Sequence, residues 1–264
     1  IVRGIIQDGD HFLLCKQKVG NYTFLLGGHI DFGEASAIRT EGKYKIITID
    51  GQDVKAKAVL IATGSDYKKL GVPGEAELYG RGVHYCATCD GAFYRDRTLA
   101  VVGGGNSAVQ EAIFLTRYAT HIDLLVRSTI KASDVLQHEL QKYVNSGQVT
   151  IHLNTSTDEI IVTDGRAAGV KVTEEGKQHD IAVDGVFVFV GLLPNTAFLE
   201  GSAIELDEVG LITTNAHLET SMPGVFASGD VRSGATMQIA SAVGEGASAA
   251  LAIREYLDEF DRTA

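Results

Sequence analysis

The strongest constraint on the fold is a strand–turn–helix pattern in the middle of the chain. A short apolar strand at 99–102 runs into Gly103-Gly104-Gly105-Asn106-Ser107-Ala108. The residues that follow, 107–118, have helical periodicity, with Ala108, Ala112 and Leu115 on one face. A second buried strand is expected at 122–126. A strand, a glycine-rich turn, a helix and a further strand form the βαβ unit of a parallel α/β sheet.

This turn has the spacing and the context of a dinucleotide-binding turn. Gly103 makes the tight turn, Gly105 lets a pyrophosphate approach the backbone, and Ala108 lets helix and strand pack closely. Asn106 and Ser107 open the helix, whose N-terminus supplies N–H donors and a positive dipole to phosphates. The alternative is a glycine-rich turn without a ligand.

The residues after the second strand indicate which nicotinamide cofactor is bound. The strand ends at Val126-Arg127-Ser128, and Lys131 follows. An acidic residue at such a position binds the ribose 2′-hydroxyl of NAD, whereas arginine accommodates the 2′-phosphate of NADP. Asp123 lies inside the strand, too early to reach the ribose. We therefore expect NADP rather than NAD; the alternative is a solvated arginine.

A dithiol motif, Cys86-Ala87-Thr88-Cys89, precedes the turn. Its two sulfurs lie within bridging reach, and a lowered thiolate pKa makes such pairs fast in thiol–disulfide exchange. The adjacent Asp90 is a candidate acid/base for the departing thiolate. The alternatives are a zinc site with His84 as third ligand, or two buried structural cysteines. No metal site is expected, and Cys15 is interpreted as a core residue.

Charge and composition narrow the classes of partner. The net charge is −11, from 23 basic and 34 acidic residues, with no run of lysine or arginine. This argues against nucleic acid and anionic membranes as partners. No apolar run is long enough to span a bilayer. With only three cysteines and no signal peptide, a cytoplasmic location is expected.

Three further segments have the character of a flavin site. Ala62-Thr63-Gly64 ends an expected buried strand, and Gly229-Asp230 ends another. Gln238-Ile239-Ala240 opens a long helix expected at 238–256. An aspartate there can accept from ribityl hydroxyls, and a helix N-terminus stabilises an anionic reduced ring. By themselves, these segments favour an ordinary strand and helix over a flavin site. Strands are also expected at 43–49 and 53–61, followed by four strand-like runs of a β-meander between 155 and 190.

From about Thr40 onward the chain resembles the low-molecular-weight thioredoxin reductases. The motifs that carry the resemblance are Ala62-Thr63-Gly64, Gly71–Glu75, Tyr79–Val83, Tyr85–Gly91, Gly103–Ala108, Gly191–Thr196, Gly229-Asp230 and Gly244-Glu245-Gly246. The resemblance implies an α/β protein that uses FAD and NADPH. A Rossmann-like NADPH domain, 73–196, with a parallel sheet and a β-meander, would be inserted in an FAD-binding domain formed by 39–72 and 197–264.

The same resemblance implies a role for each site residue. Cys89 would face the flavin, Cys86 would attack the disulfide of thioredoxin or a similar small protein, and Asp90 would be the acid. It also implies a domain rotation between two half-reactions, and a homodimer. The chain departs from the family pattern at Met237, where many members have arginine, and at Arg127-Ser128, where many have two arginines.

Residues 1–38 do not fit this family. They lack the Gly-x-Gly-x-x-Gly turn that would hold the FAD pyrophosphate, and instead show strand-like 2–6 and 11–16. Gly28 and Glu34 resemble the start of a Nudix hydrolase box, but Gly42-Lys43 and Ile46-Ile47 stand where its remaining carboxylates belong. We therefore expect a chimera: a Nudix-like fragment joined near 35–40 to an incomplete FAD-binding domain whose N-terminal half is missing.

Three hypotheses follow from this organisation. The first is a thioredoxin-disulfide reductase-type flavoprotein that passes electrons from NADPH via FAD to Cys86–Cys89, with FAD binding weak or absent and activity impaired. The second is a non-catalytic NADPH-binding fragment. The third is a Nudix hydrolase, which the missing carboxylates contradict.

Overall fold

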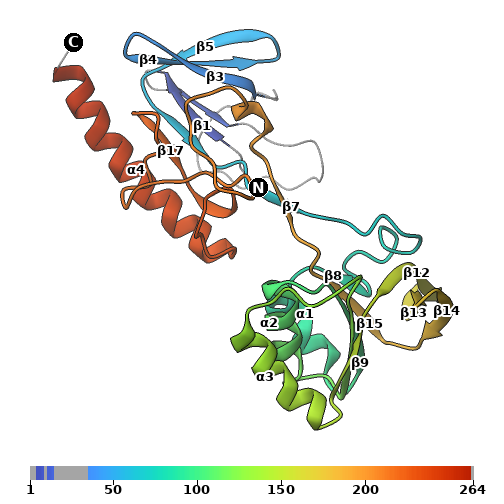
Figure 1. Ribbon diagram of the computed structural model, residues 1–264. Helices are drawn as coiled ribbons and strands as arrows, with labels where there is room; N and C mark the ends of the chain where they lie inside the picture. The colour runs from blue at the N-terminus through green and yellow to red at the C-terminus, as the bar shows by residue number, and fades with distance from the viewer. Residues whose placement is uncertain (1–3, 9–10, 15–34, 263–264) are drawn as a thin grey trace. The chain divides into compact units, whose positions relative to one another are not determined.

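The structure is a computed structural model that describes residues 4–8, 11–14 and 35–262 (Figure 1). The chain divides into two compact units. The first comprises residues 1–66 and 193–264, and the second comprises residues 67–192. These limits lie a few residues before the domain limits expected from the sequence, and the cofactor of each unit stays a prediction.

The second unit is built on a five-stranded parallel sheet. Its order is β11-β10-β9-β15-β8, and each neighbouring pair is parallel. The strands are β8 (Val83–His84), β9 (Thr98–Val102), β10 (His121–Leu125), β11 (Val149–His152) and β15 (Gly185–Val188). The expected strand–turn–helix is β9 followed by α2 (Asn106–Leu115), and α3 (Asp134–Asn145) follows β10.

Side chains alternate between the two faces of this sheet. Leu99 and Val101 of β9 pack with α2 and α3, whereas Ala100 and Val102 pack with the β-meander. The helices and the meander therefore cover opposite faces of the sheet (Figure 1). This alternation is the period of two that a strand requires.

The meander consists of β12 (Thr155–Thr163), β13 (Arg166–Glu174) and β14 (Lys177–Ile181), which pair antiparallel. Both tight turns have positive φ at each central residue: Asp164 and Gly165 in the first, Glu175 and Gly176 in the second. This backbone matches the twist of a hairpin and explains the residue types in the turns. Of the four expected runs, three form the meander, and β15 joins the parallel sheet instead.

The first unit contains two sheets and one long helix. The strands β3 (Ala35–Glu41), β4 (Tyr44–Ile49) and β5 (Gln52–Ala56) form an antiparallel meander. The helix α4 (Ile239–Arg262) extends six residues beyond the expected end and packs on β17 (Val225–Ala227) through Phe226, Ala249 and Tyr256. Outside these two sheets, the short strands β7 (Ser65–Tyr67) and β16 (Leu192–Pro194), which contain the limits of the units, pair with each other.

The second sheet of this unit has the order β17-β6-β1-β2. Here β6 (Val59–Ile61) pairs in parallel with β17 on one edge and antiparallel with β1 (Gly4–Asp8) on the other. Strands β1 and β2 (His11–Leu14) form the antiparallel hairpin that the sequence suggests. Because a strand has two edges, β6 has no free edge for a further parallel strand.

Some sequence-based expectations concern residues that the structure does not describe. The Nudix-like motif with Gly28 and Glu34 lies outside the described residues, as does Cys15. Across the residues that the structure does describe, no helix is long and apolar enough to cross a membrane.

Candidate active site

The dithiol lies at a short helix of the second unit. Cys86 and Cys89 form a disulfide with their Cα atoms 5.3 Å apart. Cys86 is the N-cap of α1 (Ala87–Asp90), and its Sγ accepts a hydrogen bond from the N–H of Cys89 at 3.2 Å. An N–H directed at sulfur stabilises a thiolate more than a thiol. The geometry therefore favours an anionic Cys86 once the disulfide is reduced.

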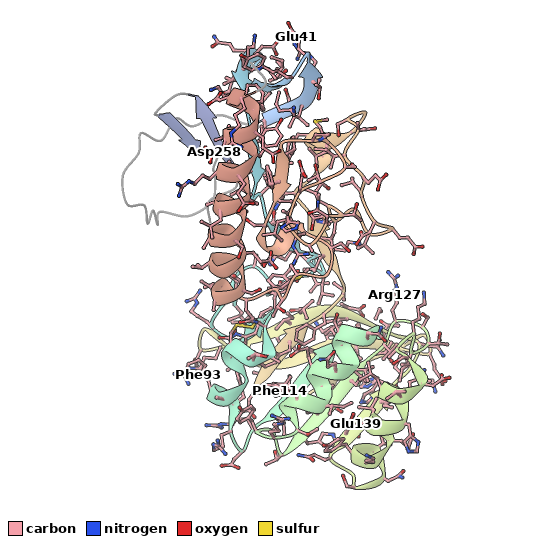
Figure 2. The ribbon with its side chains drawn as sticks, turned by 90° about the vertical axis from the view of Figure 1, so that its left-hand side faces the viewer. Glu41, Phe93, Phe114, Arg127, Glu139 and Asp258 are labelled. Atoms are coloured by element: carbon pink, nitrogen blue, oxygen red, sulfur yellow. A yellow bond between two sulfur atoms is a disulfide. The ribbon has the colours of Figure 1, made fainter. Side chains whose placement is uncertain are left out.

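The disulfide is accessible from solvent. Cys89 is exposed and Cys86 is half-buried, so the pair differs from two buried structural cysteines. In the following 3₁₀ helix η1 (Gly91–Tyr94), the Phe93 side chain is 81% exposed. Figure 2 shows Phe93 on the surface and the disulfide as a yellow bond.

The acid candidate Asp90 has a buried partner. Its Oδ2 lies 3.0 Å from Nδ1 of His84, and Nε2 of His84 lies 2.7 Å from the Tyr94 hydroxyl. Burial raises the pKa of Tyr94 to about 12, with the charge of Asp90 contributing, so this hydroxyl keeps its proton at neutral pH. The sequence suggested His84 only as a zinc ligand; in the structure it contacts Asp90 and Tyr94. Among the described residues, no group of three or more His, Cys, Asp and Glu is arranged to hold a metal ion.

A buried carboxylate, Glu75, fixes the residues that lead to Cys86. Glu75 is 4% exposed and accepts from the Tyr85 hydroxyl at 2.7 Å and from the N–H groups of Leu70 and Gly71 at 2.8 and 2.7 Å. Burial and the bond to Glu75 raise the pKa of Tyr85. Sequence reasoning quoted Glu75 as part of a motif but did not assign it this anchoring role.

The glycine-rich turn has the geometry that a phosphate site requires. Gly103 has φ +141°, and a Cβ there would lie 2.4 Å from the carbonyl oxygen of Phe189 and 2.8 Å from Cβ of Ala108. A Cβ on Gly105, in contrast, would meet nothing within 4 Å. Gly105 is the N-cap of α2 and provides no side chain to its first N–H groups, at Asn106, Ser107 and Ala108. These donors and the open space fit a pyrophosphate.

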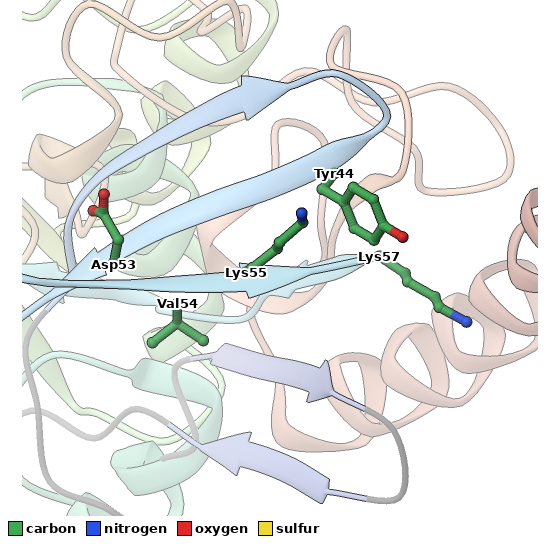
Figure 3. A pocket seen from close by; sticks show the side chains of 5 residues that line it. All are labelled: Tyr44, Asp53, Val54, Lys55 and Lys57. Carbon is green, nitrogen blue, oxygen red and sulfur yellow. The ribbon is translucent and has the colours of Figure 1, made fainter. Parts of the chain in front are cut away.

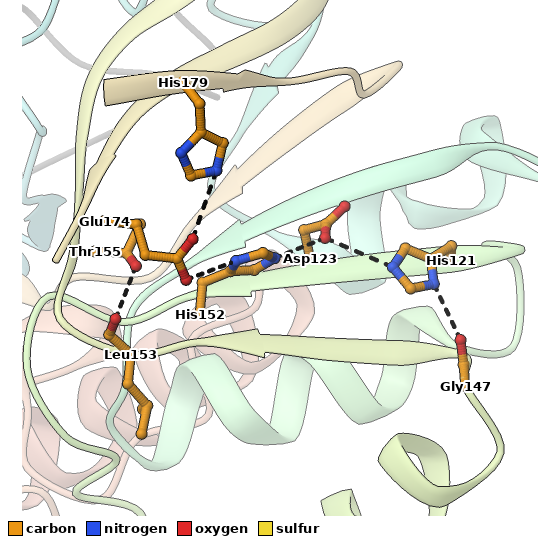
Figure 4. A network of polar contacts seen from close by, with 8 residues as sticks. All are labelled: His121, Asp123, Gly147, His152, Leu153, Thr155, Glu174 and His179. Atoms are coloured by element: carbon orange, nitrogen blue, oxygen red, sulfur yellow. Dashed lines mark hydrogen bonds and ion pairs between the residues drawn. The ribbon is translucent and has the colours of Figure 1, made fainter. Parts of the chain in front are cut away.

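The loop after β10 lies against this turn. Lys131 donates its N–H to the carbonyl of Gly104 at 2.7 Å, and Ser133 donates its N–H to Oδ1 of Asn106 at 2.8 Å. Arg127 and Lys131 both have exposed side chains in this loop. Asp123 is occupied elsewhere, because its Oδ1 lies 2.9 Å from Nε2 of His152 (Figure 4). The exposed cations Arg127 and Lys131, with Asp123 occupied elsewhere, fit the 2′-phosphate of NADP.

The residues expected at a flavin come together in the first unit. Ser228 donates its N–H to the carbonyl of Ile61 at 3.0 Å, and Ser65 donates its hydroxyl to the carbonyl of Asp230 at 2.6 Å. These bonds bring Thr63-Gly64, after β6, next to Gly229-Asp230 in η3 (Gly229–Val231). The Thr63 hydroxyl is buried without a hydrogen-bond partner among the described residues.

A partly buried ion pair holds the same turn. Glu245 of α4 accepts from the N–H of Gly229 at 2.8 Å and pairs with Arg232 at 2.5 Å. Burial raises the pKa of Asp230, and the charge of Glu245 adds to this shift. Gln238, Ile239 and Ala240 are exposed at the start of α4. Sequence reasoning missed the partnership of Arg232 with Glu245, because only the glycines around Glu245 carried a signal.

These residues fit one end of FAD. The unpartnered Thr63 hydroxyl and the Asp230 carboxyl suit the polar edge of a flavin and its ribityl hydroxyls. For the pyrophosphate end, the described residues of the first unit contain no strand–glycine turn–helix, and both edges of β6 are paired.

A further hollow lies in the first unit. It has a volume of about 570 Å³ and is lined by Tyr44, Asp53, Val54, Lys55 and Lys57 (Figure 3). The Nζ of Lys55 lies over the Tyr44 ring at 4.1 Å. None of these residues belongs to the motifs above, so we place the candidate active site at the disulfide and the glycine-rich turn.

A parallel nucleotide-binding sheet that carries a solvent-accessible C-x-x-C disulfide defines the class of nicotinamide-linked disulfide oxidoreductases. Comparison with known proteins gives the same class. The family model "Pyridine nucleotide-disulphide oxidoreductase" matches residues 5–246.

Individual relatives narrow the class. The thioredoxin reductase of Bacillus subtilis is 38% identical over 251 residues, which is 94% of this chain and 78% of that protein. The thioredoxin reductase of Listeria innocua is 40% identical over 237 residues, 88% of this chain and 73% of that protein. The crystal structure of thioredoxin reductase from Streptococcus pyogenes is 39% identical, with a TM-score of 0.80, over 88% of this chain and 76% of that one. The chain therefore belongs to the thioredoxin reductases of the pyridine nucleotide-disulphide oxidoreductase family, whose members use FAD and NADPH.

Proposed function

We propose that this chain takes electrons from NADPH and delivers them, through the Cys86–Cys89 disulfide, to the disulfide of thioredoxin or a similar small protein. The observation that carries the proposal is the disulfide itself. It is exposed, its Cys86 sulfur accepts an N–H, and it lies in the same compact unit as the glycine-rich turn. The similarity to proteins named thioredoxin reductase supports the choice of partner.

We assign NADPH to the second unit. Gly103, Gly105 and the first N–H groups of α2 would hold the pyrophosphate, and Arg127 and Lys131 would hold the 2′-phosphate. The two cations lie in a loop bonded to the turn, which supports this assignment. FAD, when bound, supplies the hydride acceptor between nicotinamide and disulfide, with Thr63, Gly64, Gly229, Asp230, Gln238, Ile239 and Ala240 as its candidate residues.

The chain's own chemistry begins with the reduced dithiol. The Cys86 thiolate attacks one sulfur of the partner's disulfide; a new S–S bond forms, and the partner's S–S bond breaks. The departing thiolate takes the proton of Asp90. Asp90, now ionised, takes the proton of Cys89. Cys89, as thiolate, then attacks Sγ of Cys86, which restores the Cys86–Cys89 disulfide, and the second partner sulfur leaves as a thiolate that is protonated from solvent.

The surface next to the disulfide supports a protein partner. Phe93 follows the dithiol by four residues and exposes 81% of its area. A large apolar side chain beside a reactive disulfide gives a partner protein an anchor that small disulfides do not need. The homodimer and the cytoplasmic location are also part of this proposal; a dithiol that must be re-reduced suits a reducing compartment.

A second function remains a candidate because of the β1–β2 hairpin. With both edges of β6 paired, the first unit has no place beside β6 for a parallel strand that would carry an FAD pyrophosphate turn. In that case the chain binds NADPH without turning it over.

One experiment separates the two functions. The purified chain is incubated with FAD, desalted, and its visible spectrum is recorded before and after addition of NADPH. Retained flavin bands that bleach with NADPH, but persist in an Arg127→Ala/Lys131→Ala variant at low NADPH, support the reductase. A colourless protein that still binds NADPH, measured by titration without flavin, supports the binding function alone.

A further inference from the structure

His84 is a buried histidine to which the proposed reaction assigns no role. It ends β8, is 6% exposed, and stacks on Phe187 with ring centroids 5.1 Å apart. Tyr94 meets the same imidazole edge-on at 5.2 Å. These contacts fix the plane of the ring, so its two nitrogens have defined directions.

The two nitrogens connect Asp90 with Tyr94. Nε2 lies 2.7 Å from the Tyr94 hydroxyl, and Nδ1 lies 3.0 Å from Oδ2 of Asp90. Although Nδ1 is within contact distance, Oδ2 lies off the direction of an N–H bond, so this buried nitrogen lacks an aligned hydrogen bond among the described residues. A rotation of the Asp90 side chain is the shortest way to satisfy it.

The contacts with Tyr94 and Asp90 allow the tautomer of His84 that carries its proton on Nδ1. Because this phenol stays protonated at neutral pH, it can donate its O–H to Nε2. A neutral imidazole whose Nε2 accepts carries its own proton on Nδ1, the side of Asp90. The order Tyr94–His84–Asp90 thus places an N–H donor beside the carboxyl group next to Cys89, and a rotation of the Asp90 side chain would align the two.

We propose that His84 is a positioning residue for Asp90. After a rotation of the Asp90 side chain, the Nδ1–H of His84 holds the carboxyl group in the orientation from which Asp90 gives its proton to the departing thiolate, and Tyr94 holds His84. This inference rests on the proposed function, because it takes the acid role of Asp90 from there. The step itself is unchanged: one S–S bond forms, one breaks, and the Asp90 proton moves to the leaving sulfur.

The charged groups around this chain of contacts are few. Asp90 faces His84 directly, and Asp184 and Arg166 act on Tyr94 through their charges. Asp184 is itself bonded to the N–H of Thr98 at 2.9 Å. The remaining ring neighbour, Phe187, carries no charge. A change at His84 therefore acts on Asp90 and Tyr94 before it reaches any other ionisable group among the described residues.

The test needs no flavin. The chain, in a Cys15→Ser background, is reduced, desalted and mixed with one of two disulfides at several pH values. Hydroxyethyl disulfide releases a poorly acidic thiol, so proton donation assists its departure. The aromatic disulfide of thionitrobenzoic acid releases a strongly acidic thiol, which departs without a proton donor. Formation of Cys86–Cys89 is followed by alkylation and mass spectrometry.

Matched variants separate the two nitrogens of His84. In His84→Asn the amide nitrogen takes the place of Nδ1 and still faces Asp90; in His84→Gln it takes the place of Nε2 and does not. We expect His84→Gln to slow exchange with hydroxyethyl disulfide about tenfold, the factor of one lost hydrogen bond. His84→Asn should keep most of the wild-type rate. Exchange with the aromatic disulfide should change little in either variant.

Three results would contradict the inference or its basis. Equal rates for His84→Gln and wild type with hydroxyethyl disulfide overturn the role of His84, provided that Asp90→Asn is slow. Equal losses with both disulfides mean that His84 supports the fold or the nucleophile and not the acid. Unchanged rates in Asp90→Asn overturn the acid role of Asp90, and with it this part of the proposed function.

Discussion

At the scale of single residues, we predict opposite effects of alanine substitution at two glycines of the same turn. A Cβ at Gly103 would lie 2.4 Å from a backbone oxygen at a positive φ, whereas a Cβ at Gly105 would meet open space. We expect Gly103→Ala to lower the free energy of unfolding by about 2–4 kcal/mol. Gly105→Ala should leave stability within about 0.5 kcal/mol but weaken NADPH binding about tenfold, because the methyl group occupies the phosphate's approach.

Both variants are measured by denaturant unfolding and by NADPH titration. The Gly105 variant tests the assignment of the NADPH pyrophosphate to this turn, since we expect it to fold and to differ from wild type only there. Unchanged affinity for NADPH in Gly105→Ala would mean that the cofactor phosphates bind elsewhere.

The same scale shows what sequence reasoning reached and what it missed. Gly103, Gly105 and Ala108 could be assigned because the constraint is local: a strand, three glycines and a helix follow one another. His84 could not. Its burial depends on the pairing of β8 with β15, about one hundred residues later, and its bond to Tyr94 depends on the turns made by α1 and η1. No spacing of residues in the sequence predicts the burial of His84 or its bond to Tyr94.

At the scale of elements, local features could again be predicted from the sequence, and pairings between distant strands could not. The helices α2 and α3 and the tight turns of the meander follow from local periodicity and turn residues. Strand β15 directly follows the meander strands along the chain, yet Gly185 pairs with Leu99 in the parallel sheet. The pairing of β1 with β6 is also non-local, because it joins the first residues of the chain to a strand more than fifty residues later.

A histidine network connects β10 and β11 with the meander, and it predicts a pH dependence of stability. His152 lies between Asp123 at 2.9 Å and Glu174 at 3.1 Å (Figure 4). The hydrogen bond to Asp123 raises the pKa of His152, although burial opposes this. The unfolded histidine titrates near 6.5, so the stabilisation is complete below about pH 6.5 and is lost as pH rises through the higher folded pKa.

The variant His152→Gln should remove this dependence. At pH 6 we expect it to lower the free energy of unfolding by about 1–3 kcal/mol, the range for hydrogen bonds to charged groups, and by less at pH 9. Denaturant unfolding at both pH values measures the effect. His138→Gln, an exposed position on α3, is the matched control. A loss that is equal at both pH values would show that His152 contributes packing and no charge.

At the scale of the whole molecule, the two units should respond separately to the two cofactors. Hydrogen exchange followed by mass spectrometry resolves them in the intact chain. With NADP⁺ alone, we expect slower exchange in peptides that cover 103–108 and 127–131, because the first N–H groups of α2 become hydrogen-bonded to phosphate. Peptides of the first unit, such as 39–61, should exchange as before.

The same measurement with FAD tests the consequence of the β1–β2 hairpin. A chain that holds FAD should protect 61–65 and 228–240, where the flavin residues gather in the first unit. If both edges of β6 are permanently paired, these peptides should show no change at concentrations that saturate a complete reductase. Protection at 228–240 together with faster exchange at 4–8 would contradict that expectation. It would mean that β1 leaves β6 when the flavin binds, and that the hairpin competes with the cofactor for the same edge of the sheet.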